Sequence, residues 1–196
     1  MNTQDFNYFS FAALEADDIA AVANSIPILL GAGRGGRIII RKNKNLNIRR
    51  FFNPAIGGGA NRLFCVWKNQ SSPHIVFLTS NDDFLTLCNA LSLRLKYNFV
   101  KCSLYRQDDI VYPHYSFHYT DCNKGKRDII VYKDPKWMFY EQGTPLPFEE
   151  LSLYQNRLKK NRLNNDIIIT YLSYLGINFY TIDKEITESY TICIDT

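Results

Sequence analysis

The side chains in this sequence that could serve as bases, nucleophiles or metal ligands are three histidines and five cysteines. His114 and His118 are four residues apart, and the alternation in residues 115–119 predicts a strand, which would hold the two rings about 13 Å apart. One metal ion does not bridge that distance, so we expect no metal site. Cys122 and His118 could supply a nucleophile and a base. No local motif supports this small-enzyme alternative, and we expect no catalytic residue.

The cysteines are scattered along the chain, without a CxxC pair and in an odd number, which indicates reduced thiols and no disulfide framework or zinc ribbon. Four of them lie in apolar runs, where cysteine usually packs as a small hydrophobe: Cys65, Cys88, Cys102 and Cys193. Cys122 lies in the polar turn 120–125, so we expect it to meet solvent. Whether its thiol is reactive stays open.

A glycine-rich segment, residues 31–36, fits the GxGxxG spacing of a dinucleotide-binding loop. Such a loop requires a helix directly after it and an acidic residue about 20 positions on. Here residues 37–41 are typical of a strand, and no acid follows until Asp82. The second glycine run, residues 57–59, lacks the Lys-Ser/Thr pair of a phosphate-binding loop. We therefore expect no nucleotide or other cofactor, and NAD, ATP or GTP should leave the melting temperature unchanged.

The charged residues are unevenly distributed, although the net charge is only +4. Residues 19–81 contain nine Lys and Arg and no Asp or Glu, and seven of the nine lie between positions 34 and 50. Acidic residues dominate after position 165. A surface of one sign steers association and selects among partners. The candidate partner-binding residues are therefore Arg34, Arg37, Arg41, Arg49 and Arg50 in the basic stretch and Asp183, Glu185 and Glu188 in the acidic C-terminal segment.

Phe51 and Phe52 directly follow the basic stretch, and basic residues beside aromatic ones are typical of nucleic-acid contacts. However, the sequence has no RRM, KH or helix-turn-helix signature, and its net charge is only mildly positive. An acidic protein partner would use the same side chains equally well. Nucleic-acid binding through residues 34–50 is therefore the less favoured alternative to protein binding.

Residues 137–140 form an aromatic-rich run, and Pro145 and Pro147 follow it closely. A proline biases the residue before it away from helix, so we expect an extended arm that lies over the edge of the sheet. Core packing of the aromatic side chains is favoured over their presentation to a partner. Since aromatic residues dominate interface energetics, Trp137 and Tyr140 are also candidate partner-binding residues.

Strand-like runs rich in β-branched and aromatic residues must position these side chains. We expect them at 37–41, 62–68, 74–79, 99–105, 115–120, 128–132 and 177–182. Residues 69–73 separate two of the runs as a hairpin loop would, and residues 121–127, with Gly125, separate two more. The short connections predict an antiparallel meander in the middle of the chain.

Helical periodicity appears at 14–23, 81–96, 152–160 and 165–175. We expect Asn81 to cap the second helix, which would place Leu91 and Leu95 on its apolar stripe, and Gly176 to end the last helix. Helices flank the strands without alternating with them, which favours an α+β fold with a mainly antiparallel central sheet. We expect one domain over residues 1–196, with a helical C-terminal part from about 148.

The composition is that of a folded protein, since 46% of the residues are hydrophobic and 21% are charged. The apolar stretch 19–30 is too short to cross a membrane, and residues 1–5 lack the basic flank of a secretory signal. We expect a cytoplasmic protein with no membrane partner.

The last third of the chain, with Trp137 to Phe148 followed by Tyr154, Arg157, Arg162 and residues 163–176, resembles small bacterial proteins encoded beside polymorphic or contact-dependent toxins. These are immunity proteins. The likeness lies in a compact domain rich in Asn, Lys, Ile and Tyr without a catalytic motif. It implies a cytoplasmic inhibitor that binds a cognate toxin domain and blocks its active site or substrate access. The resemblance assigns no role to any numbered residue.

Overall fold

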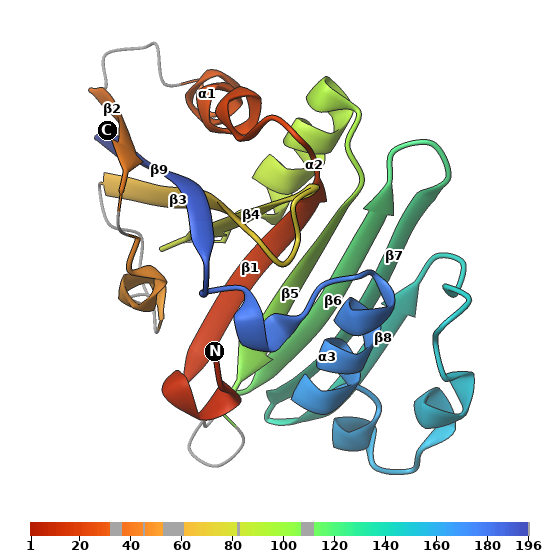
Figure 1. Ribbon diagram of the computed structural model, residues 1–196. Coiled ribbons are helices and arrows are strands. Elements are labelled where there is room, and N and C mark those ends of the chain that lie inside the picture. The colour runs from red at the N-terminus through yellow and green to blue at the C-terminus, as the bar shows by residue number, and fades with distance from the viewer. Residues whose placement is uncertain (32–36, 45, 53–60, 82, 107–111, 196) are drawn as a thin grey trace.

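The described part of the chain folds around one large antiparallel sheet (Figure 1). The computed structural model describes residues 1–31, 37–44, 46–52, 61–81, 83–106 and 112–195. The strands are β1 (Tyr8–Glu15), β2 (Ile38–Asn43), β3 (Asn61–Asn69), β4 (Ile75–Ser80), β5 (Phe99–Tyr105), β6 (His114–Asp121), β7 (Gly125–Asp134), β8 (Lys136–Gln142) and β9 (Ile186–Asp195). The helices are α1 (Ile19–Leu29), α2 (Leu85–Leu95) and α3 (Asn165–Tyr174). The predicted α+β class with an antiparallel sheet is confirmed.

The strand order is β2-β9-β3-β4-β1-β5-β6-β7-β8, and every neighbouring pair is antiparallel. Strands β5, β6 and β7 follow one another as the predicted meander, and β8 extends it beyond the predicted strands. The predicted hairpin loops are confirmed between β3 and β4 and between β6 and β7, where Gly125 has a φ of +120°. The last strand, β9, does not extend the meander, because it inserts between β2 and β3.

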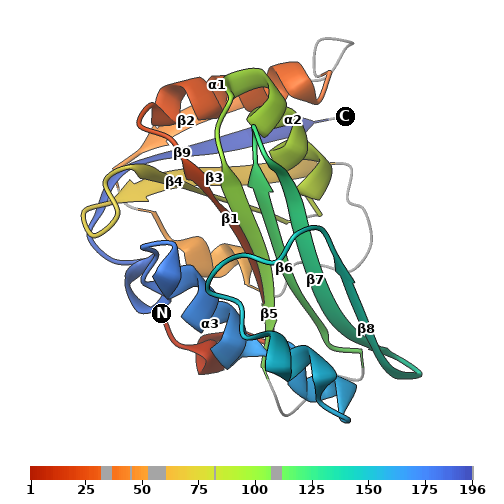
Figure 2. The ribbon, with the colours of Figure 1, turned by 90° about the vertical axis from the view of Figure 1, so that its right-hand side faces the viewer.

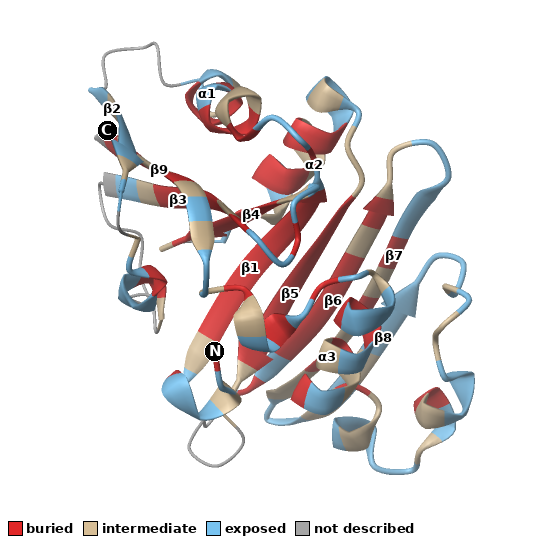
Figure 3. Ribbon diagram, in the orientation of Figure 1, coloured by how far each residue is buried: buried red, intermediate tan, exposed pale blue. Residues whose placement is uncertain are grey.

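Helices cover opposite faces of the two halves of the sheet (Figures 1 and 2). α1 packs on β9 and β3, and α2 packs on α1 and β5; their shared core includes Leu14, Val22 and Leu91. α3 lies on the other face, against β5 and β6, and its core includes Phe117 and Tyr171. As Figure 3 shows, the central strands are buried along most of their length.

Capping residues explain where two of the helices begin or end. The Asp18 side chain accepts from the Ala21 amide at 2.9 Å at the start of α1. Asn164 caps α3 by accepting from the Ile167 amide at 3.0 Å, and Gly176, with a φ of +74°, follows its end as predicted. The predicted cap of the second helix is wrong: Asn81 accepts from the Leu63 amide of β3, and α2 begins at Leu85.

Three expected elements differ from the structure. Residues 14–23 divide between β1 and α1, because β1 is buried on both faces and its unbroken apolar run lacks the alternation of a one-sided strand. Residues 177–182 contain the 3₁₀ turn η5 (Phe179–Thr181) and no strand, since Asn178 accepts from the Tyr180 amide and turns the chain. Residues 152–160 are two 3₁₀ turns, η3 (Leu151–Gln155) and η4 (Lys159–Asn161).

The expected arm over the sheet edge is itself a strand. Residues 136–142 form β8, which pairs with β7 along its length and is the last strand of the sheet. No strand was predicted for residues 186–195, which form β9. Among the described residues, no helix combines the length and the apolar character that crossing a lipid bilayer would require.

Candidate functional site

The basic stretch lies at the β2 edge of the sheet. Arg37 and Arg41 are exposed there, and Arg49 and Arg50 are exposed in η2 (Ile48–Phe51), a 3₁₀ turn. Arg34 lies outside the described residues. Arg49 is not a free cation, because its Nη2 is 3.7 Å from Asp5 Oδ2. The structure therefore places Arg41 on β2, Arg37 directly before it, and Arg49 and Arg50 on a separate turn.

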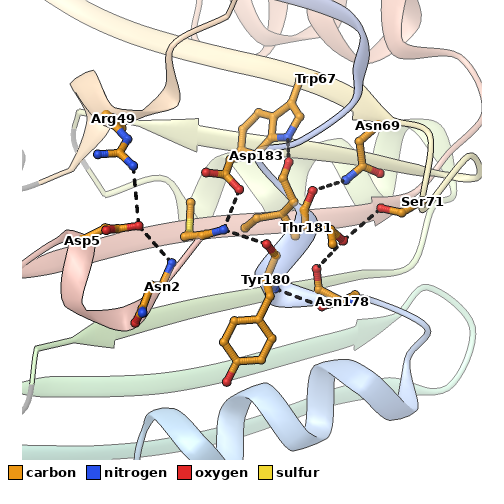
Figure 4. A network of polar contacts seen from close by, with 12 residues as sticks. Asn2, Asp5, Arg49, Trp67, Asn69, Ser71, Asn178, Tyr180, Thr181 and Asp183 are labelled. Atoms are coloured by element: carbon orange, nitrogen blue, oxygen red, sulfur yellow. Dashed lines mark hydrogen bonds and ion pairs between the residues drawn. The ribbon is translucent and has the colours of Figure 1, made fainter.

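The acidic residue Asp183 has a structural partner. Figure 4 shows its carboxylate beside the amine of Met1, which donates to Asp183 Oδ1 at 2.8 Å and to the Tyr180 carbonyl at 2.7 Å. The same segment is held to β3, where Trp67 Nε1 donates to the Ile182 carbonyl at 2.7 Å. Asp183 thus joins the start of the chain to residues 180–183 and is engaged within the fold.

The other two acidic candidates lie beside the basic stretch. Glu188 is on β9, the neighbour of β2, and its Oε1 is 2.5 Å from Lys42 Nζ. Glu185 is exposed just before β9, with a φ of +49°. Because β9 lies between β2 and β3, the opposite signs that are far apart in the sequence are neighbours in space. The structure does not present them as two separate one-signed surfaces.

Trp137 and Tyr140 lie on opposite faces of β8. Trp137 is half-buried and packs against the core that α3 covers. Tyr140 is 46% exposed on the other face, where it lies opposite Ile130 of β7. The two aromatic candidates therefore cannot contact the same partner surface, and Tyr140 alone is available on the open face.

The face of β5 to β8 that carries Tyr140 is the candidate site, and we call it the polar face. Its side chains on β8 are exposed, whereas those on the central part of β5 and β6 are buried. The helical segments with the main contacts to β6, β7 and β8 are α3 and η4, which pack on the opposite face. In Figure 2 the polar face extends below α2. By strand register it consists of Lys101, Ser103, His114, Ser116, His118, Asp128, Ile130, Tyr132, Met138, Tyr140 and Gln142.

Two charged pairs occupy the polar face. Lys101, His118 and Asp128 are direct cross-strand neighbours on β5, β6 and β7. His118 Nδ1 lies 2.8 Å from Asp128 Oδ1, and the Lys101 ammonium lies 3.2 Å from Asp83 Oδ1, just before α2. Lys101 and His118 are only 4% and 7% exposed. Since burying charge is unfavourable unless it is paired, these contacts hold both side chains in fixed positions.

The electrostatics of the polar face act on two further groups. Burial opposes ionisation of Asp83, but the Lys101 ammonium and the amides of Phe84 and Leu85 outweigh it and lower the pKa of the carboxyl. Partial burial of the His114 ring, followed by the charge of Lys101, lowers the pKa of His114. At neutral pH the polar face therefore carries an ionised Asp83 and a neutral His114.

A row of serines crosses the polar face beside the charged pairs. Ser10 of β1 lies opposite Ser103 of β5, which lies opposite Ser116 of β6. Ser10 Oγ donates to the Cys102 carbonyl at 3.2 Å. Ser116 is 1% exposed, and no described group within hydrogen-bond distance pairs with its Oγ.

A buried ion-pair network holds the segment after β8 against the sheet. Arg127 of β7 is 2% exposed, and its Nε and Nη2 donate to both carboxylate oxygens of Glu149 at 2.7–3.1 Å. Glu141 of β8 accepts a further bond from Nη2. Tyr154 donates to Glu149 at 2.9 Å and contacts Tyr171 of α3. The network packs the residues after β8 on the face opposite the polar face, which leaves the polar face open.

The Cys122–His118 pair considered as a small-enzyme alternative does not form. Cys122 Sγ contacts the Lys96 carbonyl at 3.4 Å, whereas His118 pairs with Asp128. Cys65, Cys88 and Cys102 are buried as expected, but Cys193 is half-buried. Among the described residues, no cluster of three or more His, Cys, Asp or Glu side chains is arranged to hold a metal ion. Residues 32–36 and 57–59, the glycine segments, lie largely outside the described residues.

Sequence reasoning missed the pairs His118–Asp128, Lys101–Asp83 and Arg127–Glu149. The strand alternation around His118 did place a polar side chain on one face of an apolar strand. However, each partner comes from a different strand or loop, and the register between strands is not visible in the sequence. The sequence offered one signal for these pairs, a charged residue inside an apolar strand, as at Lys101 and Arg127.

Comparison of the chain with protein-family models, with curated proteins and with solved structures gives no match in any of the three. The site is therefore interpreted from its own geometry.

Proposed function

We propose that this protein functions by binding another protein, and that it is a cytoplasmic inhibitor of the immunity type, which neutralises a cognate toxin domain. The observation that carries the proposal is the polar face: the buried side chains of Lys101 and His118 are each paired with a carboxylate, and Tyr132, Met138 and Tyr140 lie beside them on β7 and β8. Tyrosine and methionine are enriched in protein interfaces, and hot spots gather around such aromatic anchors.

The fixed side chains of the polar face support recognition of a specific partner. Lys101 and His118 are already paired and nearly buried before a partner arrives, so little side-chain entropy would be lost on binding. The contact of His118 Nδ1 with the Asp128 carboxylate fixes the orientation of the ring. Tyr140 supplies a large apolar ring with few rotamers at the edge of the same face.

The experiment first requires the neighbouring open reading frame to encode a large secreted protein with a variable C-terminal domain, and it then uses that domain as the binding partner. Tyr140→Ala should weaken the complex by about 10-fold or more, the usual effect of removing a hot-spot aromatic residue. Tyr180→Ala is the matched control, since Tyr180 is 51% exposed on η5, outside the polar face. Binding is measured by calorimetry, and protection by survival of cells that produce both proteins.

Charge reversal in the acidic segment would not test the same proposal cleanly. Reversal at Asp183 or Glu188 breaks the contacts with Met1 and Lys42, so a loss of binding could reflect altered folding. Glu185 and Arg50, both exposed, are better probes of the electrostatic contribution. Equal loss of binding in Tyr140→Ala and Tyr180→Ala, or no loss in either, would contradict the role of the polar face.

A second candidate function, acid–base catalysis, is favoured by the His118–Asp128 pair. A carboxylate on Nδ1 orients an imidazole, as in many general bases. A hydrolase would lose turnover in His118→Gln while its substrate binding stayed intact. A protein-binding inhibitor would instead lose affinity in the same variant, so comparison of the two readouts separates the candidates.

A further inference from the structure

We propose that β2 accepts an added β-strand from a partner protein, and that the added strand alternates apolar with acidic residues. The inference deepens the proposed function, on which it rests for the partner being a protein. It concerns the β2 edge of the sheet, at the opposite end from the polar face.

The geometry of β2 is that of an open edge. Among the described strands it has one neighbour, β9, with which it pairs from Ile38 to Asn43. Every second residue of such a strand directs its N–H and C=O groups away from the sheet, where another strand can bind them. β2 contains no proline, which would block this pairing, and its six residues include three consecutive isoleucines with high β-propensity.

The two faces of β2 differ in chemistry. Ile38 and Ile40 lie opposite Ile194 and Ile192 of β9, on the face that α1 covers, and they are 39% and 38% exposed. Their partners in β9 are buried. An added strand with apolar residues on this face would continue the same core and cover both isoleucines. Burying apolar area of this kind favours association.

The opposite face of β2 carries positive charge. Arg41 is exposed there, opposite Thr191, and no ion pair to it is present among the described residues. Lys42, by contrast, already has Glu188 as its partner. Opposite charges on directly paired positions stabilise a sheet, so acidic residues in the added strand fit the face of Arg41.

A second copy of this chain that paired through the middle of β2 would bring like charges together. If Ile39 paired with Ile39 of another copy, Arg37 of each copy would lie directly opposite Arg41 of the other, as the antiparallel register requires. Like charges at directly opposite positions are destabilising. The net charge of +4 on each copy opposes the contact further. Charge complementarity therefore selects an acidic strand from a different protein.

The probe is an acetylated and amidated eight-residue peptide in which Glu alternates with Val, and its control has Lys in place of Glu. We expect the Glu peptide to bind the intact protein and slow amide hydrogen exchange in residues 38–43. The Lys peptide should bind at least about 10-fold more weakly. Arg41→Glu should reverse this preference, and Arg41→Gln should abolish it. Arg50→Glu, an exposed reversal on η2, should leave it unchanged.

Three outcomes would overturn the inference. The first is equal affinity for the Glu and Lys peptides. The second is protection of β8 amides instead of β2 amides. The third is no detectable binding at a peptide concentration of about 1 mM, which would detect even a weak complex. The proposed function is tested separately with the toxin domain. If that domain binds without protecting residues 38–43, the strand addition is wrong and the proposed function stands.

Discussion

Lys42 of β2 and Glu188 of β9 form an ion pair, with Nζ 2.5 Å from Oε1, that joins the basic stretch to the acidic C-terminal segment. The hydrogen bond between them raises the pKa of Lys42 and lowers that of Glu188. The Lys42 side chain is 64% exposed, so solvent and salt screen the contact. Its main consequence is structural, because it pairs charges that are 146 positions apart.

The Lys42–Glu188 contact can be tested by exchanging its charges. Lys42→Glu alone places two acidic side chains on neighbouring strands, so the urea midpoint of unfolding should fall. Adding Glu188→Lys should restore it. The restoration should shrink in high salt, as expected for an exposed pair. If the double variant were less stable than the single one, the two side chains would not interact as described.

Leu91 and Leu93 on α2 provide a matched test of core packing. Leu91 is fully buried between α2 and the sheet, whereas Leu93 is 71% exposed on the same helix. Leu91→Ala should lower the free energy of unfolding by about 2–5 kcal/mol because it leaves a cavity. Leu93→Ala should change it by about 0.5 kcal/mol or less. Leu95 is half-buried, so its truncation should fall between the two in chemical denaturation.

The Arg127–Glu149 pair should contribute strongly to holding the segment after β8. Glu149→Gln leaves the buried guanidinium without its two-bonded partner and should cost about 3–5 kcal/mol, as for other broken buried pairs. Glu150→Gln is the control, since Glu150 is the exposed neighbour in sequence. Urea unfolding measures both variants. A similar small effect in the two variants would show that the pair does not bear on stability.

The cysteines should divide by burial when the folded protein is alkylated with iodoacetamide at about pH 8, where the thiolate reacts. Burial raises the pKa of Cys65 and Cys88 to about 12, and it also raises that of Cys102. Only the half-buried Cys122 and Cys193 should react. Mass spectrometry of the intact protein should then show two adducts, and five after unfolding. A third adduct on the folded protein would contradict this division.

His114 should make the protein less stable in mild acid. Its pKa is lowered in the folded protein from the ordinary value of 6.5, by partial burial and then by Lys101. Below that pH the unfolded chain binds a proton that the folded protein does not, so the free energy of unfolding decreases as the pH falls. His114→Asn should remove part of this decrease in urea titrations between about pH 7 and pH 5. An unchanged pH dependence would refute the assignment.

The local elements follow largely from local sequence. Six of the seven predicted strand runs lie in strands, because alternation and β-branched residues report a one-sided or buried strand directly. Both ends of α3 follow from local sequence. The side chain of Asn164 caps its first turn, and the positive φ of Gly176 directly follows its last turn. The end of β1 was predicted as the start of a helix and residues 8–13 carried no prediction, because a strand buried on both faces has no alternation to recognise.

The sequence by itself determined the class of the fold, the succession of β5, β6 and β7 and the polar character of one face of β6. The tertiary structure decided which charges meet. β9 inserts between β2 and β3, so Glu188 pairs with Lys42, and residues 180–183 return to the start of the chain, so Asp183 pairs with Met1. The register of β5, β6 and β7 aligns Lys101, His118 and Asp128. Strand order and register depend on contacts between distant segments, and local patterns carry no information about which distant strand will pair.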